Sequence, residues 1–130
     1  MQEDQRHPQP EQKTVVEQVQ GEINNIPSLA DINKYGEQVI RSAQNHPKLR
    51  DQIGNMLQGR RESLMASHRV EIRSKIDKAN LATLNTDLSI NAIRKSFIDA
   101  GMTEEEAENS VNDILQHYND RLKKLEEEQA

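Results

Sequence analysis

The chain has 130 residues, which is enough for one domain and hardly for two. It is 33% hydrophobic and 30% charged, only 2% of its residues are aromatic, and its net charge is −5. A small globular core usually contains more large rings, because each one buries roughly 150–250 Å². We therefore expect a small elongated helical bundle that is completed by self-association or by a partner.

Several classes of protein and site are excluded by residues that the sequence lacks. There is no cysteine, so the chain has neither disulfides nor thiolate zinc sites, and a reducing compartment is compatible with it. No apolar run approaches the ~18 residues of a membrane span, and the polar N-terminus is unlike a signal peptide. We expect a cytoplasmic protein with no membrane association.

Charge is distributed unevenly along the chain. Residues 1–45 carry a net charge of −3, residues 46–78 carry +4, and residues 79–130 carry −6. The basic segment, residues 46–78, is therefore flanked by acidic sequence on both sides. This pattern indicates electrostatic attraction, either within the chain, between copies of it, or toward an anionic partner.

The N-terminal part is read as a tail followed by helices. Residues 1–12 contain two prolines and almost nothing to bury, which predicts a disordered tail. Residues 13–84 form an N-terminal helical region, whose first helix ends at Pro27 because proline disfavours the helical conformation of the residue before it. Ser28 is the expected N-cap of the second helix. Pro47 suits the first turn of the third helix, where a missing N–H costs nothing.

The third helix contains two glycines, Gly54 and Gly59, each of which costs about 1 kcal/mol in a helix interior. We expect a break at Gly59, because a new apolar pattern follows it, and then a further helix from Arg60 to about Leu84. A single helix over residues 47–84 is the alternative. The apolar spacing does not hold a heptad for three repeats, so a regular coiled coil is not predicted.

The clearest local signals lie in residues 85–126, which we predict to be a C-terminal helical hairpin. The residues that specify its turn and caps are Gly101, Met102, Thr103 and Glu106. Gly101 suits the left-handed position that ends a helix, and Met102 follows it as the apolar contact of that cap. Thr103 and Glu106 are three residues apart and form a capping box that starts the next helix.

These elements together predict an all-α protein of four to six helices. It has a disordered N-terminal tail, a C-terminal helical hairpin and a frayed end at residues 127–130. The sequence shows no strand pattern bounded by turns and no internal repeat.

Catalytic and metal-binding motifs are not found. Asp113 and His117 are four residues apart on one helix face, which is a spacing for two metal ligands, but a site needs at least one or two more. Ser67 and His68 are adjacent in a helix and point to different faces, so they do not form a nucleophile–base pair. We expect no enzyme, no cofactor and no metal.

The basic segment makes a DNA-associated accessory protein the alternative function. Its candidate phosphate contacts are Arg60, Arg61, Arg69, Arg73, Lys75 and Lys78. The basic segment also contains four acidic residues, and it has no aromatic ring on which a base could stack. A helix-turn-helix role for the hairpin is rejected, because its second helix begins with Glu104, Glu105 and Glu106, which phosphates would repel.

The function that we favour is a non-enzymatic adaptor or regulatory protein acting through protein–protein association, as a homo-oligomer or with a protein partner. Amphipathic helices with few aromatic rings suit a bundle whose core is shared between chains. The expected interface anchors are Met56, Leu57, Leu64, Met65, Ile114, Tyr118, Leu122 and Leu125. All of them suit a monomer core equally well. Tyr118 is the preferred anchor, because a ring with a polar tip is favoured at interfaces.

Overall fold

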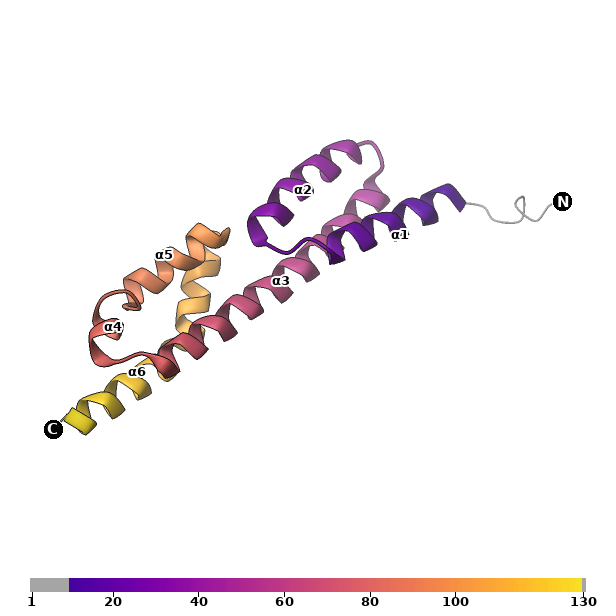
Figure 1. Ribbon diagram of the computed structural model, residues 1–130. Coiled ribbons are helices and arrows are strands. Elements are labelled where there is room, and N and C mark those ends of the chain that lie inside the picture. The colour runs from indigo at the N-terminus through magenta and orange to yellow at the C-terminus, as the bar shows by residue number, and fades with distance from the viewer. Residues whose placement is uncertain (1–9, 130) are drawn as a thin grey trace. The chain divides into compact units, whose positions relative to one another are not determined.

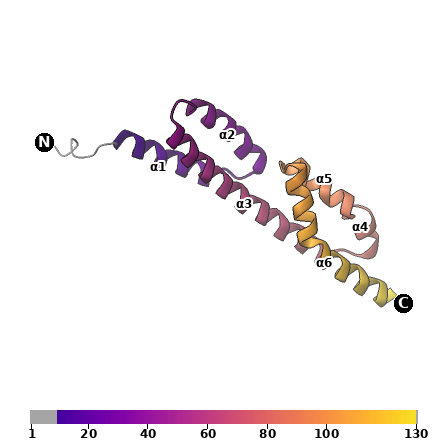
Figure 2. The same cartoon turned by 180° about the vertical axis from the view of Figure 1, so that it is seen from behind.

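The computed structural model describes residues 10–129, with side chains from Val15 onward. Its helices are α1 (Pro10–Asn24), α2 (Leu29–Ser42), α3 (Pro47–Lys78), α4 (Leu81–Asn85), α5 (Ile90–Ala100) and α6 (Glu104–Gln129) (Figure 1). No strand occurs within the described residues, as Figure 2 shows from the opposite side. The predicted all-α class and the expected number of helices are confirmed.

The two ends of the chain differ from the expected boundaries. Of the tail expected over residues 1–12, residues 1–9 lie outside the described part, and residues 10–12 belong to α1. At the other end, α6 continues through Gln129, so most of the segment expected to fray is helical.

The expected break at Gly59 is wrong, because α3 passes through this residue without interruption. A Cβ atom placed on Gly54 or Gly59 would meet nothing within 4 Å, so both glycines lie on open sides of the helix. Their propensity cost of about 1 kcal/mol each is offset by burial of nearby apolar side chains, which are Ile53 beside Gly54 and Leu57 and Leu64 on either side of Gly59. The helix ends at Lys78 rather than near Leu84, since a new short helix, α4, begins after Asn80.

The chain divides into two compact units within α3, at residues 62 and 63. Unit 1 comprises α1, α2 and the first half of α3, and unit 2 comprises the second half of α3 with α4, α5 and α6. The boundary therefore falls inside a helix, whereas the sequence suggested a division at residues 84 and 85.

Unit 1 encloses a small aliphatic core. Its buried side chains come from all three helices: Val19, Ile23, Leu29, Ile32, Ala43, Ile53 and Leu57. The predicted N-cap is confirmed, because Ser28 Oγ accepts a hydrogen bond from the backbone N–H of Asp31 at 3.2 Å. Gly36 is also buried, and a Cβ atom there would lie 3.3 Å from Leu57 Cδ1. A glycine at this point therefore lets α2 approach α3 closely.

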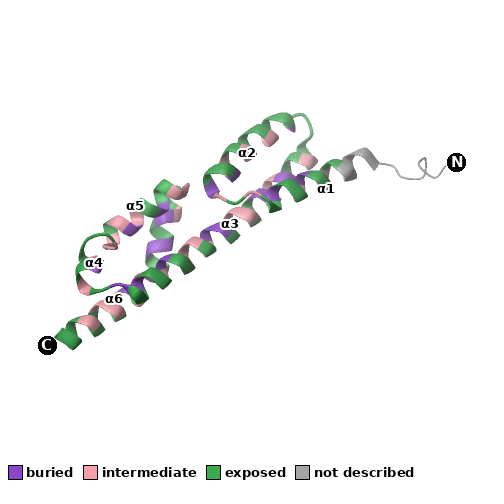
Figure 3. Cartoon of the chain, viewed as in Figure 1, coloured by how far each residue is buried: buried purple, intermediate pink, exposed green. Residues whose placement is uncertain are grey.

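Unit 2 has a larger core that includes the one phenylalanine. Its buried side chains are Leu64, Met65, Ile72, Ile76, Ala79, Leu84, Ile93, Phe97, Met102, Ala107, Ser110, Val111, Ile114 and Tyr118. The buried positions of α6 lie between Ala107 and Tyr118, and the buried part of this helix lies beside α5 (Figure 3). The Tyr118 hydroxyl donates a hydrogen bond to the Leu84 carbonyl at 2.6 Å, which ties α6 to α4.

The predicted turn of the hairpin between α5 and α6 is confirmed. Gly101 has φ 119°, in the left-handed region that a side chain rarely adopts. The N–H of Met102 bonds to the Phe97 carbonyl at 3.1 Å, which closes the end of α5. Thr103 N–H donates to Glu106 Oε1 at 2.9 Å, and Glu106 N–H donates to Thr103 Oγ1 at 3.1 Å. This reciprocal pair is the capping box that the sequence predicts.

Helices α2 and α3 of unit 1 correspond to α5 and α6 of unit 2, at positions 61 residues apart (28 to 89, 60 to 121). The equivalent pairs include Ser28 and Ser89, Ile32 and Ile93, Ile53 and Ile114, Leu57 and Tyr118, and Arg60 and Arg121. Each serine N-caps its helix with a hydrogen bond of 3.2 Å, and all four isoleucines are almost fully buried. Exposed, half-buried and buried side chains follow in the same order over residues 51–63 and 112–124.

Helix α1 of unit 1 likewise corresponds to the second half of α3 in unit 2, at positions 53 residues apart (19 to 72, 23 to 76). Val19 and Ile23 in α1 are buried, as are Ile72 and Ile76 in α3. The two offsets differ by eight residues (61 against 53), and the extra residues in unit 2 form α4 and the turn after it. The chain therefore contains a structural repeat that the sequence did not reveal, with α4 as an addition to the second copy.

Candidate interaction surface

The arginines of the basic segment in unit 1 make contacts inside that unit. Arg60 donates through Nε and Nη2 to the Ile26 carbonyl, at 3.1 and 2.7 Å, just beyond the end of α1. Arg61 Nη1 donates to Asn33 Oδ1 on α2. Both guanidinium groups are therefore engaged in joining α3 to the other two helices, which reduces their value as phosphate contacts.

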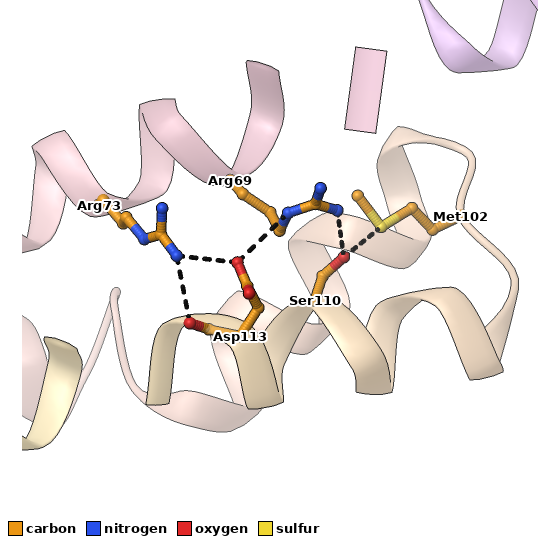
Figure 4. Close-up of polar contacts among 5 residues, drawn as sticks. All are labelled: Arg69, Arg73, Met102, Ser110 and Asp113. Carbon is orange, nitrogen blue, oxygen red and sulfur yellow. Dashed lines mark hydrogen bonds and ion pairs between the residues drawn. The ribbon is translucent and has the colours of Figure 1, made fainter. Parts of the chain in front are cut away.

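The arginines of the basic segment in unit 2 meet a single carboxylate on α6 (Figure 4). Asp113 Oδ2 lies 2.8 Å from Arg73 Nη2 and 3.5 Å from Arg69 Nε. Arg73 also donates to the Asp113 carbonyl at 3.2 Å. Arg69 Nη1 donates at 3.3 Å to the buried Ser110 hydroxyl, which in turn donates to Met102 Sδ at 3.4 Å. Basic and acidic parts of the sequence thus neutralise each other within unit 2.

The polar contacts between α3 and α6 continue toward the end of α3. Asp77 Oδ1 accepts from His117 Nε2 at 2.7 Å, and Arg121 Nη2 donates to the Ala79 carbonyl at 3.0 Å. The side chains of this α3–α6 polar seam are partly exposed, so each ion pair contributes about 0–1 kcal/mol.

The two side chains considered as metal ligands, Asp113 and His117, both take part in this seam. Asp113 pairs with two arginines and His117 with Asp77, so the two side chains have separate partners on α3. Over residues 15–129, no group of three or more carboxylate or imidazole side chains is arranged to hold a metal ion.

Two lysines of the basic segment differ from its arginines. Lys75 and Lys78 are exposed, and neither makes a hydrogen bond or ion pair with any residue that the structure describes. Both line a shallow hollow of about 500 Å³ at the end of α3, together with Ala79, Asn80, Thr83, Asp87 and Leu88. Of the six cationic candidates, these two are the ones available to a ligand.

The expected interface anchors fall into two groups. Leu57, Leu64, Met65, Ile114 and Tyr118 are buried within the described chain and belong to its core. Met56, Leu122 and Leu125 are half-buried and remain accessible. Tyr118 is therefore a core residue here, and burial raises the pKa of its hydroxyl. Sequence reasoning missed Val70, an apolar residue of α3 that is 62% exposed. Helical spacing does not identify Val70, because this residue lies off the apolar stripe of the helix.

The second tyrosine joins two helices of unit 1. The Tyr35 hydroxyl donates a 2.5 Å hydrogen bond to Glu22 Oε1, which connects α2 to α1. Desolvation raises the pKa of Tyr35 to about 12, and the hydrogen bond and the negative charge of Glu22 add to the effect. Sequence patterns do not identify this pair, because it depends on how two helices pack.

Comparisons with protein-family models, with curated proteins and with solved structures find no match to this chain. Within the described residues, none of the helices has the length and apolar character needed to cross a membrane.

Proposed function

We propose that this protein is a non-enzymatic helical adaptor or regulator that acts through protein–protein association, as a cytoplasmic homo-oligomer or with a protein partner. The observation that carries the proposal is the apolar stripe of α6. Beyond Tyr118, its last buried residue, the stripe continues through Leu122 and Leu125, which are half-buried and accessible. Accessible leucines on an amphipathic helix are typical of a surface on which another helix packs.

Light scattering on the full chain at tens of micromolar tests the proposal. We expect the mass of a dimer or a larger assembly, and a monomer when Leu122→Ser and Leu125→Ser are combined. The far-UV circular dichroism of that variant should stay helical, because neither leucine is fully buried. Leu49→Ser, at a half-buried leucine of α3 in unit 1, is the matched control and should leave the mass unchanged. A monomeric unaltered chain would contradict oligomerisation, and capture of a partner would then be required.

A DNA-associated accessory protein is the second candidate, and the unpaired lysines favour it. Of the six candidate cations, Lys75 and Lys78 are the ones best placed to contact phosphates, since the four candidate arginines have partners inside the units. This candidate predicts duplex binding that weakens steeply with salt and disappears when both lysines are changed to glutamate. Absence of binding at low salt would eliminate it.

A further inference from the structure

The helix α4 has no counterpart in unit 1, which packs its three helices without it. In unit 1 one residue, Pro27, separates the carbonyl that Arg60 binds from the N-cap of the next helix. In unit 2 the equivalent carbonyl belongs to Ala79 and the equivalent N-cap is Ser89, with α4 between them. Insertions in a repeated unit commonly lie on its binding face.

The hollow described above is built from this insertion and the end of α3. Asn80, Thr83, Asp87 and Leu88 line it from the inserted side, and the lysines line it from α3. Two lysines and one acidic residue, Asp87, line it, so the hollow has an excess of positive charge within a unit that is acidic overall. Lysines near a helix C-terminus also complement the helix dipole, but this role needs no hollow beside them.

We propose that this hollow binds an acidic segment of a partner protein, through a carboxylate held by Lys75 and Lys78. The inference rests on the proposed function and names the chemistry of one partner contact. Leu88, Ala79 and the lysine stems supply apolar surface, which suits a glutamate or aspartate beside an apolar residue better than a bare phosphate. The net charge of −5 further disfavours a long polyanion such as DNA, which the rest of the surface would repel.

A titration followed by ¹⁵N–¹H NMR on the full chain tests the inference. The probe is a blocked peptide of alternating glutamate and leucine, compared with the same peptide carrying glutamine in place of glutamate. We expect the acidic peptide to shift the backbone amides of residues 75–88, and the neutral peptide to leave them unchanged.

The double variant Lys75→Glu and Lys78→Glu should weaken binding of the acidic peptide by about tenfold or more. Lys123→Glu with Lys124→Glu is the matched control, because it makes the same change in net charge on exposed lysines of α6 and should have little effect. Equal losses in the two variants would overturn the inference, and so would unmoved amides over residues 75–88. Stronger shifts of the same amides with duplex DNA would assign the hollow to the alternative function instead. An unchanged oligomer mass in these experiments would leave the proposed association intact.

Discussion

The two units share a core plan but differ in the polar contacts beside it. Arg60 and Arg121 make the same contact to a carbonyl in the two units, but the ion pairs of the α3–α6 polar seam occur only in unit 2, between Arg69, Arg73, Asp77, Asp113 and His117. The equivalent residues of unit 1 are Val16, Gln20, Asn24, Gln52 and Met56, and all of them are uncharged. The buried isoleucines are nevertheless retained in both units. The comparison indicates that aliphatic burial determines how three helices pack, while the seam is free to carry charge or not.

Substitutions in the shared core should have the largest effect on stability. Ile53→Ala in unit 1 and Ile114→Ala in unit 2 should each lower the free energy of unfolding by about 2–5 kcal/mol, because both side chains are at most 1% exposed. Urea unfolding of the full chain measures both effects. A loss well below 2 kcal/mol at one position would show that the equivalence of the two isoleucines is superficial.

The seam is the place where the units should differ. Asp113→Ala removes the carboxylate shared by two arginines, and we expect it to lower the free energy of unfolding by about 1 kcal/mol. Gln52→Ala, the equivalent change in unit 1, should have almost no effect. The difference should shrink in 1 M salt, because screening weakens exposed ion pairs. A difference that persists unchanged in high salt would mean that packing rather than charge is responsible.

Two glycines of unit 1, Gly59 in α3 and Gly36 in α2, should respond differently to substitution by alanine. Gly59→Ala should raise the free energy of unfolding by about 0.5–1 kcal/mol, because α3 is continuous there and the new methyl group meets nothing within 4 Å. Gly36→Ala should gain less or destabilise, since its methyl group would press on Leu57 at 3.3 Å. Thermal unfolding of both variants checks the order, and an equal gain would show that Leu57 moves aside freely.

Alkaline pH should affect unit 1 through Tyr35. Its pKa is raised from 10.0 to about 12 in the folded chain, so the unfolded state loses its proton first as pH rises. The stabilisation is complete below pH 10 and is lost between pH 10 and about 12. Tyr35→Phe should flatten this part of the stability profile. Absorbance of the phenolate measures the titration directly, and an unshifted titration of Tyr35 would rule the effect out.

Much of the fold could be predicted because its signals are local. Ser28, Pro47 and the turn at Gly101 act through backbone groups a few residues away, and each occupies the expected position. The continuity of α3 could not be predicted in this way. The cost of Gly59 is local, whereas the burial of Leu57 and Leu64 that offsets it depends on tertiary packing.

The candidate sites were predicted less completely than the helices. The sequence identified the charged residues but not their partners, because Arg73 and Asp113 meet only once α3 and α6 lie side by side within unit 2. The repeat was missed for a related reason. A few equivalent positions keep their residue type, such as Ser28 and Ser89, but most differ, and pairs such as Leu57 and Tyr118 keep only their burial.

The helix α3 is both the third helix of unit 1 and the first helix of unit 2. Because helix formation is cooperative, melting one half of α3 frays the other half and removes packing partners from the neighbouring unit. Folding of each unit is therefore thermodynamically linked to folding of the other, as for adjacent members of a repeat array. We expect the whole chain to unfold in a single transition, although its core is divided in two.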